Sequence, residues 1–340
     1  MDYAFRRTYG RELKSKLSQW HTVTMTLVIC AVSLLFAYQY SGDYSTAADA
    51  DATLLWRLIS SLMTDSTLTG ISGAVILTVT ALMQQRANYH MTLIRHKTKL
   101  PFLLFFLLGS TNVGFLPVRP ASVAMLFFIP ALFELFKSQE RMESPRAFNA
   151  AALFGFGSLI WVQLLWFIPV YWYGMYKFKL LGTRNLLAIL LGVLTVYGFV
   201  LGLCVWQRDF TALTVSVHQL AAIDMSSPQD LMRNFQWMTA TGIFLLLLAI
   251  SLYIRFQGFA SAPHTRRILS FLLFFAVYAF ALLFLYSKLY FSDVLYFMYM
   301  PASLIFACYF SSKHGVAAFL LYYTFLVFMF LSALMQIWAL

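Results

Sequence analysis

The stretch Asn185–Trp206 reads NLLAILLGVLTVYGFVLGLCVW and contains no charged residue. An α-helix rises 1.5 Å per residue, so a helix of this length is about 33 Å long. That is enough to cross the hydrocarbon core of a bilayer, which is about 30 Å thick. Lipid offers no hydrogen-bond partners to the backbone, so such a segment crosses a membrane as a helix. The stretch therefore predicts an all-α membrane protein.

The composition of the whole chain leads to the same class. Of the 340 residues, 61% are hydrophobic and 11% are charged, whereas about a quarter of the residues in a soluble domain are charged. The net charge is +11, but the cations lie in short clusters between apolar runs, as cytoplasmic loops do under the positive-inside rule. This pattern argues against nucleic acid as a partner.

The apolar runs predict a bundle of about eleven helices. Their ranges are 21–38, 68–84, 100–115, 121–136, 148–163, 164–177, 185–206, 236–254, 268–287, 294–310 and 315–337. The third to sixth of these are shorter than a straight span requires, which predicts tilted helices or helices buried within the bundle. The alternative for residues 148–177 is one long tilted helix.

The charge distribution predicts a cytoplasmic N-terminus and an extracytoplasmic C-terminus. With eleven helices, all but five of the 24 Lys and Arg residues lie inside, and most of the acids lie outside. The five cations outside are Arg57, Arg119, Arg208, Arg233 and Lys288. Merging 148–177 into one helix would reverse every later loop. The run 21–38 is predicted to be an uncleaved first span, the alternative being a leader cleaved near Ala48.

The chain is predicted to form a single integral membrane domain over residues 1–340, with a cytoplasmic segment at 1–20. Two outer loops, 39–67 and 207–235, each contain apolar residues at helical spacing. These are Leu54, Leu58 and Leu62 in the first loop, and Leu213, Val217 and Leu220 in the second. Both loops are therefore predicted to carry amphipathic helices that lie on the outer leaflet.

The common chemistry-bearing motifs are absent. The sequence holds no P-loop, G-x-G-x-x-G, H-E-x-x-H or C-x-x-C, so no metal site and no cofactor are predicted. Cys30, Cys204 and Cys308 lie within apolar runs and are interpreted as small buried hydrophobes. Gly198 and Gly202 have the spacing that lets two helix backbones approach closely.

The candidate catalytic residue is Asp43, which follows the first helix on the predicted outer side. A carboxylate at the membrane surface can act as a general base that deprotonates an acceptor hydroxyl. Arg119, Arg208 and Arg233 lie on the same side and can hold a phosphate by bidentate contacts. The alternative is that Asp43, with Asp49 and Asp51, only solvates the loop and enforces the topology.

This layout resembles that of polytopic glycosyltransferases that use polyprenyl-phosphate sugars. The shared features are the cytoplasmic N-terminus, the many helices, and an acidic first outer loop with amphipathic helices. The resemblance implies a polyprenyl-phosphate-linked sugar as substrate, Asp43 as the base, and the outer arginines as phosphate ligands.

A second resemblance covers roughly residues 20–210. The segments NYHMTLIRHKTKLPFLLFFLLGS, RPASVAMLFFIPALFELFK, FNAAALFGFGSLIWVQLLWFIPVYWYGM and LGTRNLLAILLGVLTVYGFVLG resemble a family of polytopic inner-membrane proteins of Bacteroidota that has no assigned activity. This resemblance implies a multi-pass protein of the bacterial inner membrane.

Three functions are consistent with these observations. The first is a scaffold or subunit in cell-envelope or surface-glycan assembly, with membrane lipids and envelope proteins as partners. The second is the glycosyltransferase described above. The third is a lipid or small-molecule transporter, which is disfavoured because the predicted spans hold almost no charge apart from Glu134.

Overall fold

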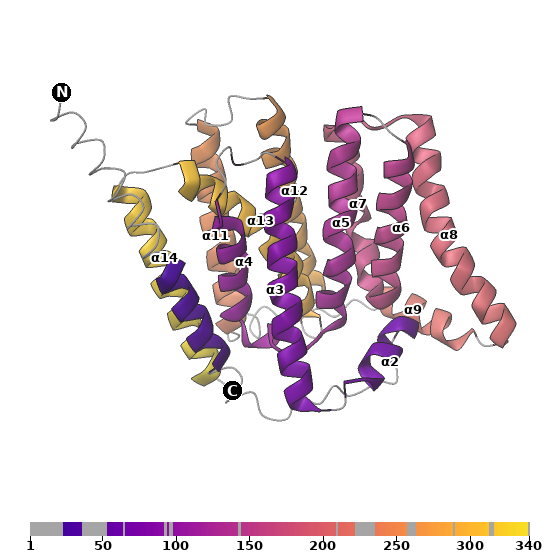
Figure 1. The fold of residues 1–340 in the computed structure, drawn as a ribbon, viewed down its shortest axis with the longest axis horizontal. Helices are drawn as coiled ribbons and strands as arrows, with labels where there is room; N and C mark the ends of the chain where they lie inside the picture. Colours follow the sequence, from indigo (N-terminus) through magenta and orange to yellow (C-terminus); the bar gives the residue numbers. More distant parts are fainter. Residues whose placement is uncertain are drawn as a thin grey trace, which may run out of the picture.

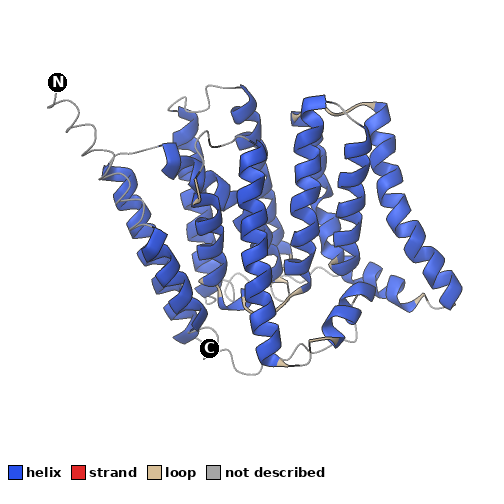
Figure 2. Ribbon diagram, viewed as in Figure 1, coloured by secondary structure: helices blue, strands red, loops and turns tan. Residues whose placement is uncertain are grey.

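The computed structural model describes residues 23–35, 53–63, 65–91, 94, 98–141, 144–208, 210–221, 235–256, 263–287, 290–312 and 316–338. Helices account for the regular structure of these residues (Figure 2). The predicted all-α class is therefore confirmed.

The helices follow one another along the chain with short connections. After a helix at Val23–Leu35 come α2 (Leu54–Ser61), α3 (Ser66–Met91), α4 (Leu100–Ser110), η1 (Val113–Phe115), α5 (Pro120–Arg141), α6 (Ser144–Ile160), η2 (Val162–Phe167), α7 (Ile168–Lys177), α8 (Thr183–Gln207), α9 (Thr211–Ala221), α11 (Phe235–Phe256), α12 (Pro263–Leu285), α13 (Phe291–Ser312) and α14 (Val316–Trp338).

Seven helices of the described chain are long and apolar enough to cross a membrane, namely α3, α5, α8, α11, α12, α13 and α14. By helix length and hydropathy this is a multi-pass membrane protein. The helices α4, α6 and α7 are shorter, with 11, 17 and 10 residues, as their short apolar runs predicted. The run 121–136 was also predicted to be short, and this was wrong, because α5 has 22 residues.

The helix α13 forms the centre of the bundle (Figure 1). In its apolar window 78% of the residues are buried, against 12% in that of α8. An aromatic cluster surrounds it, in which Phe297 of α13 contacts Phe128 of α5, Trp161 and Phe167 at ring-centroid distances of 4.8–5.2 Å. Aromatic packing therefore joins the central helix to α5 and η2.

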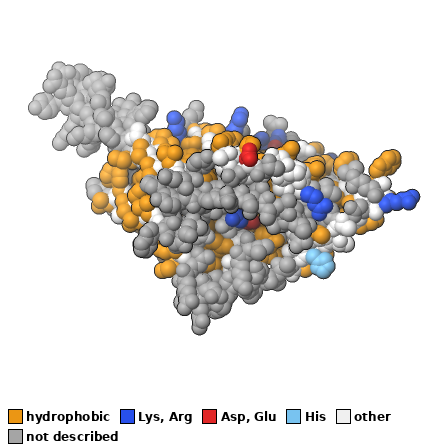
Figure 3. Space-filling view, turned by 90° about the horizontal axis from the view of Figure 1, so that it is seen from below, with side chains coloured by type: hydrophobic (Ala, Val, Ile, Leu, Met, Phe, Trp, Pro, Cys, Tyr) orange, Lys and Arg blue, Asp and Glu red, His pale blue; other side chains and the backbone are white. Residues whose placement is uncertain are grey.

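The two ends of the bundle differ in charge. The end formed by the C-terminus of α5, the α7–α8 turn and the N-terminus of α12 is here called the basic end. It carries Lys137, Lys177, Lys179, Arg184, Arg266 and Arg267. The opposite end, here called the η1 end, carries η1, α2 and α9. Figure 3 views the η1 end, and the side chains of described residues along its flanks are mostly hydrophobic.

Several predicted helix ends were wrong. The helix α3 continues to Met91, beyond the predicted end at residue 84, so Arg86 lies within it, and exposed, rather than in a loop. The helix α4 ends at Ser110 rather than at residue 115. The helix α13 begins at Phe291, before the predicted start at residue 294, and therefore includes Asp293.

Residues 148–177 form two antiparallel segments rather than one long helix. The helix α6 ends at Ile160, and the chain returns through η2 and α7 until Phe178 contacts Phe136 at the C-terminal part of α5. Non-helical backbone within a membrane is tolerated where protein covers it, and Trp161 at this break is only 1% exposed. The predicted topology of eleven helices required this change of chain direction between α6 and α7.

The two predicted amphipathic helices exist as α2 and α9, and both contact the bundle at the η1 end. The Thr53 hydroxyl donates to the Ile160 carbonyl at 2.7 Å, and Trp56 is buried. Leu58 and Leu62 of the predicted apolar face are 61% and 79% exposed, which leaves them to lipid or a partner.

A backbone carbonyl of α9 accepts hydrogen bonds from two side chains of the bundle. The Trp166 indole and the Tyr286 hydroxyl both donate to the Leu220 carbonyl, at 3.3 Å and 3.4 Å. Burial raises the pKa of Tyr286 to about 12, so this hydroxyl stays a neutral donor at physiological pH.

The predicted close approach at Gly198 and Gly202 was wrong for contacts within the described chain. A side chain at either position would meet no atom within 4 Å. The helix α8 instead packs on α6 through Gly192, where a Cβ would lie 2.6 Å from the Phe148 carbonyl oxygen. Beyond Tyr197, which is hydrogen bonded to Ser158, α8 diverges from α6 (Figure 1).

Candidate functional site

The candidate site lies in the connection between α4 and α5 at the η1 end. The Asn112 side-chain oxygen accepts the backbone N–H of Gly114 at 3.0 Å, a side-chain turn that competes with a continued helix. This explains why α4 ends early and η1 begins. Pro120 then occupies the first position of α5, where its missing N–H is tolerated.

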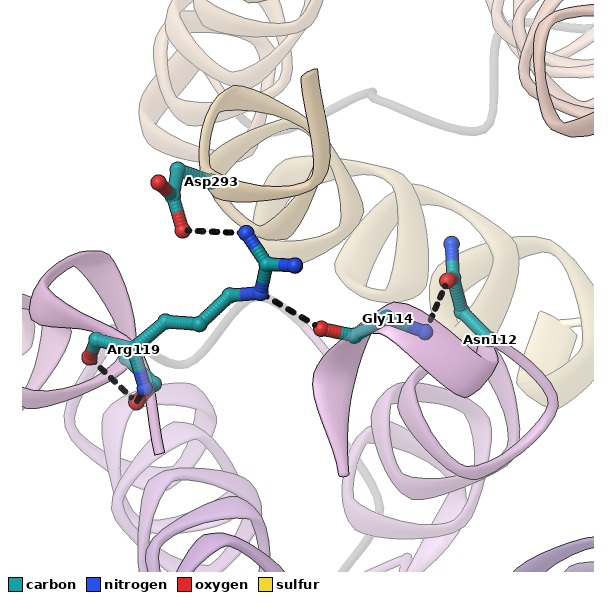
Figure 4. Close-up of polar contacts among 5 residues, drawn as sticks. Asn112, Gly114, Arg119 and Asp293 are labelled. Atoms are coloured by element: carbon teal, nitrogen blue, oxygen red, sulfur yellow. Dashed lines mark hydrogen bonds and ion pairs between the residues drawn. The ribbon is translucent and has the colours of Figure 1, made fainter. Parts of the chain in front are cut away.

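Arg119 precedes α5, and its backbone is fixed by Ser122. The Arg119 N–H donates to the Ser122 hydroxyl at 3.2 Å, and that hydroxyl donates to the Arg119 carbonyl at 2.8 Å. The Arg119 Nε donates to the Gly114 carbonyl at 2.8 Å. Both the backbone and the guanidinium of Arg119 are therefore held by the same short connection (Figure 4).

The guanidinium points toward Asp293 of α13 (Figure 4). The Arg119 Nη1 lies 3.8 Å from Asp293 Oδ1, and the two side chains are 35% and 4% exposed. At 3.8 Å the contact is an ion pair rather than a hydrogen bond, and Asp293 Oδ1 has no hydrogen-bond partner. The site therefore combines a buried carboxylate with a partly exposed cation.

Asp293 is 3% exposed, and this burial disfavours a negative charge there, whereas its place in the helix favours one. It lies in the first turn of α13, where the helix dipole stabilises an anion. The backbone of η1 approaches α13 closely, since a side chain at Gly114 would lie 2.6 Å from the Ser292 hydroxyl oxygen. Glycine at this position therefore lets the α4–α5 connection bring Arg119 to Asp293.

Sequence reasoning missed Asp293 as a site residue. It was assigned to an outer loop at the start of an apolar run, on the same predicted side as Arg119. The predicted location of Arg119 and Asp293 on the same side of the membrane was the available signal. It does not indicate which of the outer acids contacts Arg119.

Of the remaining predicted site residues the structure describes only Arg208, which does not join this pair. Asp43 and Arg233 lie outside the described residues, as do Asp49 and Asp51. Arg208 ends α8 in a left-handed conformation, with φ of 55°, and is exposed. It lies at the edge of the bundle, at the far end of the diverging part of α8 (Figure 1), whereas Arg119 contacts the central helix.

Within the described ranges, no group of three or more His, Cys, Asp or Glu side chains is placed to hold a metal ion. Cys30, Cys204 and Cys308 are buried free thiols, as predicted. Glu134 is paired with Lys137 and Arg146 at the basic end, at 3.6 Å and 3.8 Å.

No known family model matches this chain, and no curated protein matches it either. The geometry of the site is therefore what indicates which chemistry this chain can perform. A guanidinium with open N–H groups can bind a phosphate or carboxylate, and a carboxylate beside it can accept a proton from a ligand hydroxyl.

Proposed function

We propose that this protein acts in cell-envelope assembly at a bacterial inner membrane, by binding the anionic head group of a lipid-linked substrate at Arg119. The observation that carries the proposal is the partly exposed guanidinium, held at the end of the bundle by the Gly114 carbonyl and Asp293. In the predicted topology this end faces the outside.

The geometry suits head-group binding because the arginine is already ordered. A ligand therefore does not have to offset the entropy of fixing a long side chain. One N–H of Arg119 is used by Gly114, and a guanidinium has five. The remaining donors can form the paired contacts to a phosphate that arginine makes well.

A glycosyl transfer from a polyprenyl-phosphate sugar fits this arrangement. Asp293 lies on the other side of the guanidinium from the Gly114 contact (Figure 4) and is proposed as the base that takes the acceptor hydroxyl proton. The acceptor oxygen then bonds to the anomeric carbon of the sugar while the bond from that carbon to the phosphate oxygen breaks, and polyprenyl phosphate leaves with its negative charge bound by Arg119. Asp43 remains the alternative base. A transporter that binds the same head group without chemistry would use Arg119 in the same way.

We expect cells without this protein to accumulate one lipid-linked sugar, measured by mass spectrometry of extracted lipids. Complementation with Arg119→Gln or Asp293→Asn should leave at least about ten times more of it than the wild type does, because one charge contact to a phosphate contributes about 1.5–3 kcal/mol. Asp43→Asn tests the alternative base.

The matched control is Arg57→Gln, which removes an exposed arginine from α2 at the same end. It should complement like the wild type, and the lipid signal of each variant is compared after correction for the amount of that variant in the membrane. An unchanged lipid profile in the deletion strain would contradict the proposal, and clearance by Arg119→Gln at the wild-type level would remove Arg119 from the site.

A second candidate function is that of a subunit or scaffold. The observation that favours it is the exposure of α8. Only 12% of its apolar window is buried, and no atom lies within 4 Å of a side chain built at Gly198 or Gly202. Small residues at this spacing allow a second helix to approach closely in a membrane. A partner helix packed there would cover the part of α8 that leaves the bundle.

A photo-crosslinking amino acid at Gly202, activated in native membranes, is expected to give protein adducts that mass spectrometry identifies. The same group at Leu252 of α11, which is 52% exposed, should give lipid adducts alone. If both positions yield only lipid adducts, α8 faces lipid and the subunit function loses its support.

A further inference from the structure

Polar side chains connect α3 and α13 inside the bundle. The Thr80 and Tyr296 hydroxyls are hydrogen bonded at 2.8 Å. One helical turn further, the Gln84 amide nitrogen donates to the Met300 carbonyl at 2.7 Å and also to the Ser303 hydroxyl. These contacts define the α3–α13 seam, which lies within two predicted spans.

Gln84 Oε1, on this seam, has no hydrogen-bond partner. Both side-chain polar atoms of Asn88, four residues further along α3, also have none. Gln84, Asn88 and Thr80 are all 0% exposed. At the η1 end of the seam, the Asn112 nitrogen and Asp293 Oδ1 also lack a hydrogen bond. The unpaired atoms therefore occur along the whole seam, from the candidate site toward the basic end.

Interhelical hydrogen bonding alone explains only part of this pattern. Polar side chains often join membrane helices, and the Thr80–Tyr296 and Gln84–Ser303 contacts are of that kind. Interhelical hydrogen bonding does not explain Asn88, because its side-chain amide is buried without any partner, and such a group is destabilising in hydrocarbon. Buried polar groups of this kind are commonly satisfied by bound water.

The spacing of the seam matches water bridges. Thr80, Gln84 and Asn88 are four residues apart on one face of α3, and four residues rise about 6 Å. Two hydrogen bonds of about 2.8 Å through one water span nearly that distance. Asp293, Tyr296, Met300 and Ser303 follow one face of α13 in the same direction. A single water can therefore link each level of the seam to the next.

We propose that α3 and α13 enclose a file of bound water molecules that leads from the Arg119–Asp293 pair to Asn88. The hydroxyls of Thr80, Tyr296 and Ser303 each donate and accept, so they continue the hydrogen bonding between waters. The unpaired oxygen of Gln84 and the amide of Asn88 bind the waters farther from Asp293. The file gives the Asp293 carboxyl contact with water from within the membrane.

Radiolytic hydroxyl labelling of the intact protein in nanodiscs tests this directly, because ordered internal water produces radicals beside the side chains that it touches. We expect Tyr296 to be hydroxylated at least about five times faster than Tyr322. Both tyrosines are buried and hydrogen bonded to a threonine of another helix, Thr80 and Thr26 respectively, but only Tyr296 is on the α3–α13 seam. Equal slow labelling of the two would overturn the proposal.

The variant Gln84→Leu should slow labelling of Tyr296 at least about threefold. Gln85→Leu is its matched control, since Gln85 is the next residue and bonds to Tyr89 at the helix surface; it should leave the rate unchanged. Should Gln84→Leu not fold, the wild-type comparison of Tyr296 with Tyr322 still decides. The readout is independent of head-group binding, so it can fail while the proposed function stands.

Discussion

Gly73→Ala is expected to destabilise the folded protein by about 3 kcal/mol or more, and to cut its accumulation in the membrane severely. A Cβ at Gly73 would lie 1.9 Å from the Leu116 carbonyl oxygen and 3.2 Å from the Pro117 carbonyl carbon. Overpacking usually costs about 1–3 kcal/mol. Here the clash is with backbone, so the cost lies at the top of that range or above it.

The consequence would reach the candidate site, because Leu116 and Pro117 belong to the connection that carries Arg119. The measurement is the midpoint of thermal unfolding in detergent, determined by fluorescence-detected gel filtration of heated samples. Gly198→Ala is the control, since nothing lies within 4 Å of its Cβ and alanine is favoured over glycine in a helix by about 0.5–1 kcal/mol. A stable Gly73→Ala protein would show that the α3 contact with this connection is wrong.

Arg119→Leu is expected to cost about 2–4 kcal/mol of stability, because it leaves the Asp293 carboxylate buried without its cation. Removing one partner of a buried ion pair typically costs about 3–5 kcal/mol. We expect a somewhat smaller cost than this, since the Arg119 side chain is 35% exposed. The double variant Arg119→Leu with Asp293→Leu should recover most of the loss.

The measurement is a double-mutant cycle on the unfolding midpoint, with Asp293→Leu as the other single variant. A coupling free energy of at least about 1 kcal/mol is expected. The matched comparison is Lys137→Leu, which removes one cation from the more exposed Glu134 pair and should change stability by less than about 1 kcal/mol. Additive effects at Arg119 and Asp293 would mean that the pair does not interact.

Most helices were predictable because the signal for them is local. A long apolar run such as that of α8 can satisfy its backbone in lipid only as a helix, whatever its neighbours are. The amphipathic segments that became α2 and α9 were predictable for a similar reason, since apolar spacing is read from a few turns. The helix ends were harder, because α4 ends where the Asn112 side chain takes a backbone N–H.

The candidate site was predictable only in part. Arg119 was named from its position on the predicted outer side, whereas Asp293 was not, and Arg208 was named but lies apart at the edge of the bundle. Asp43 and Arg233 stay predictions. The distribution of charges along the chain assigns residues to a side of the membrane. It does not predict which outer cation contacts which outer acid, because every such pairing is equally consistent with it.

The sequence by itself determined that this is an all-α, multi-pass membrane protein, because hydrophobicity and length decide whether a segment leaves water. Only the tertiary structure decided that Arg119 meets Asp293 and that Gln84 is hydrogen bonded to α13. Those pairings depend on how the backbones approach one another, through glycines such as Gly73 and Gly114. Such close approaches join residues far apart in the chain, and no local pattern specifies them.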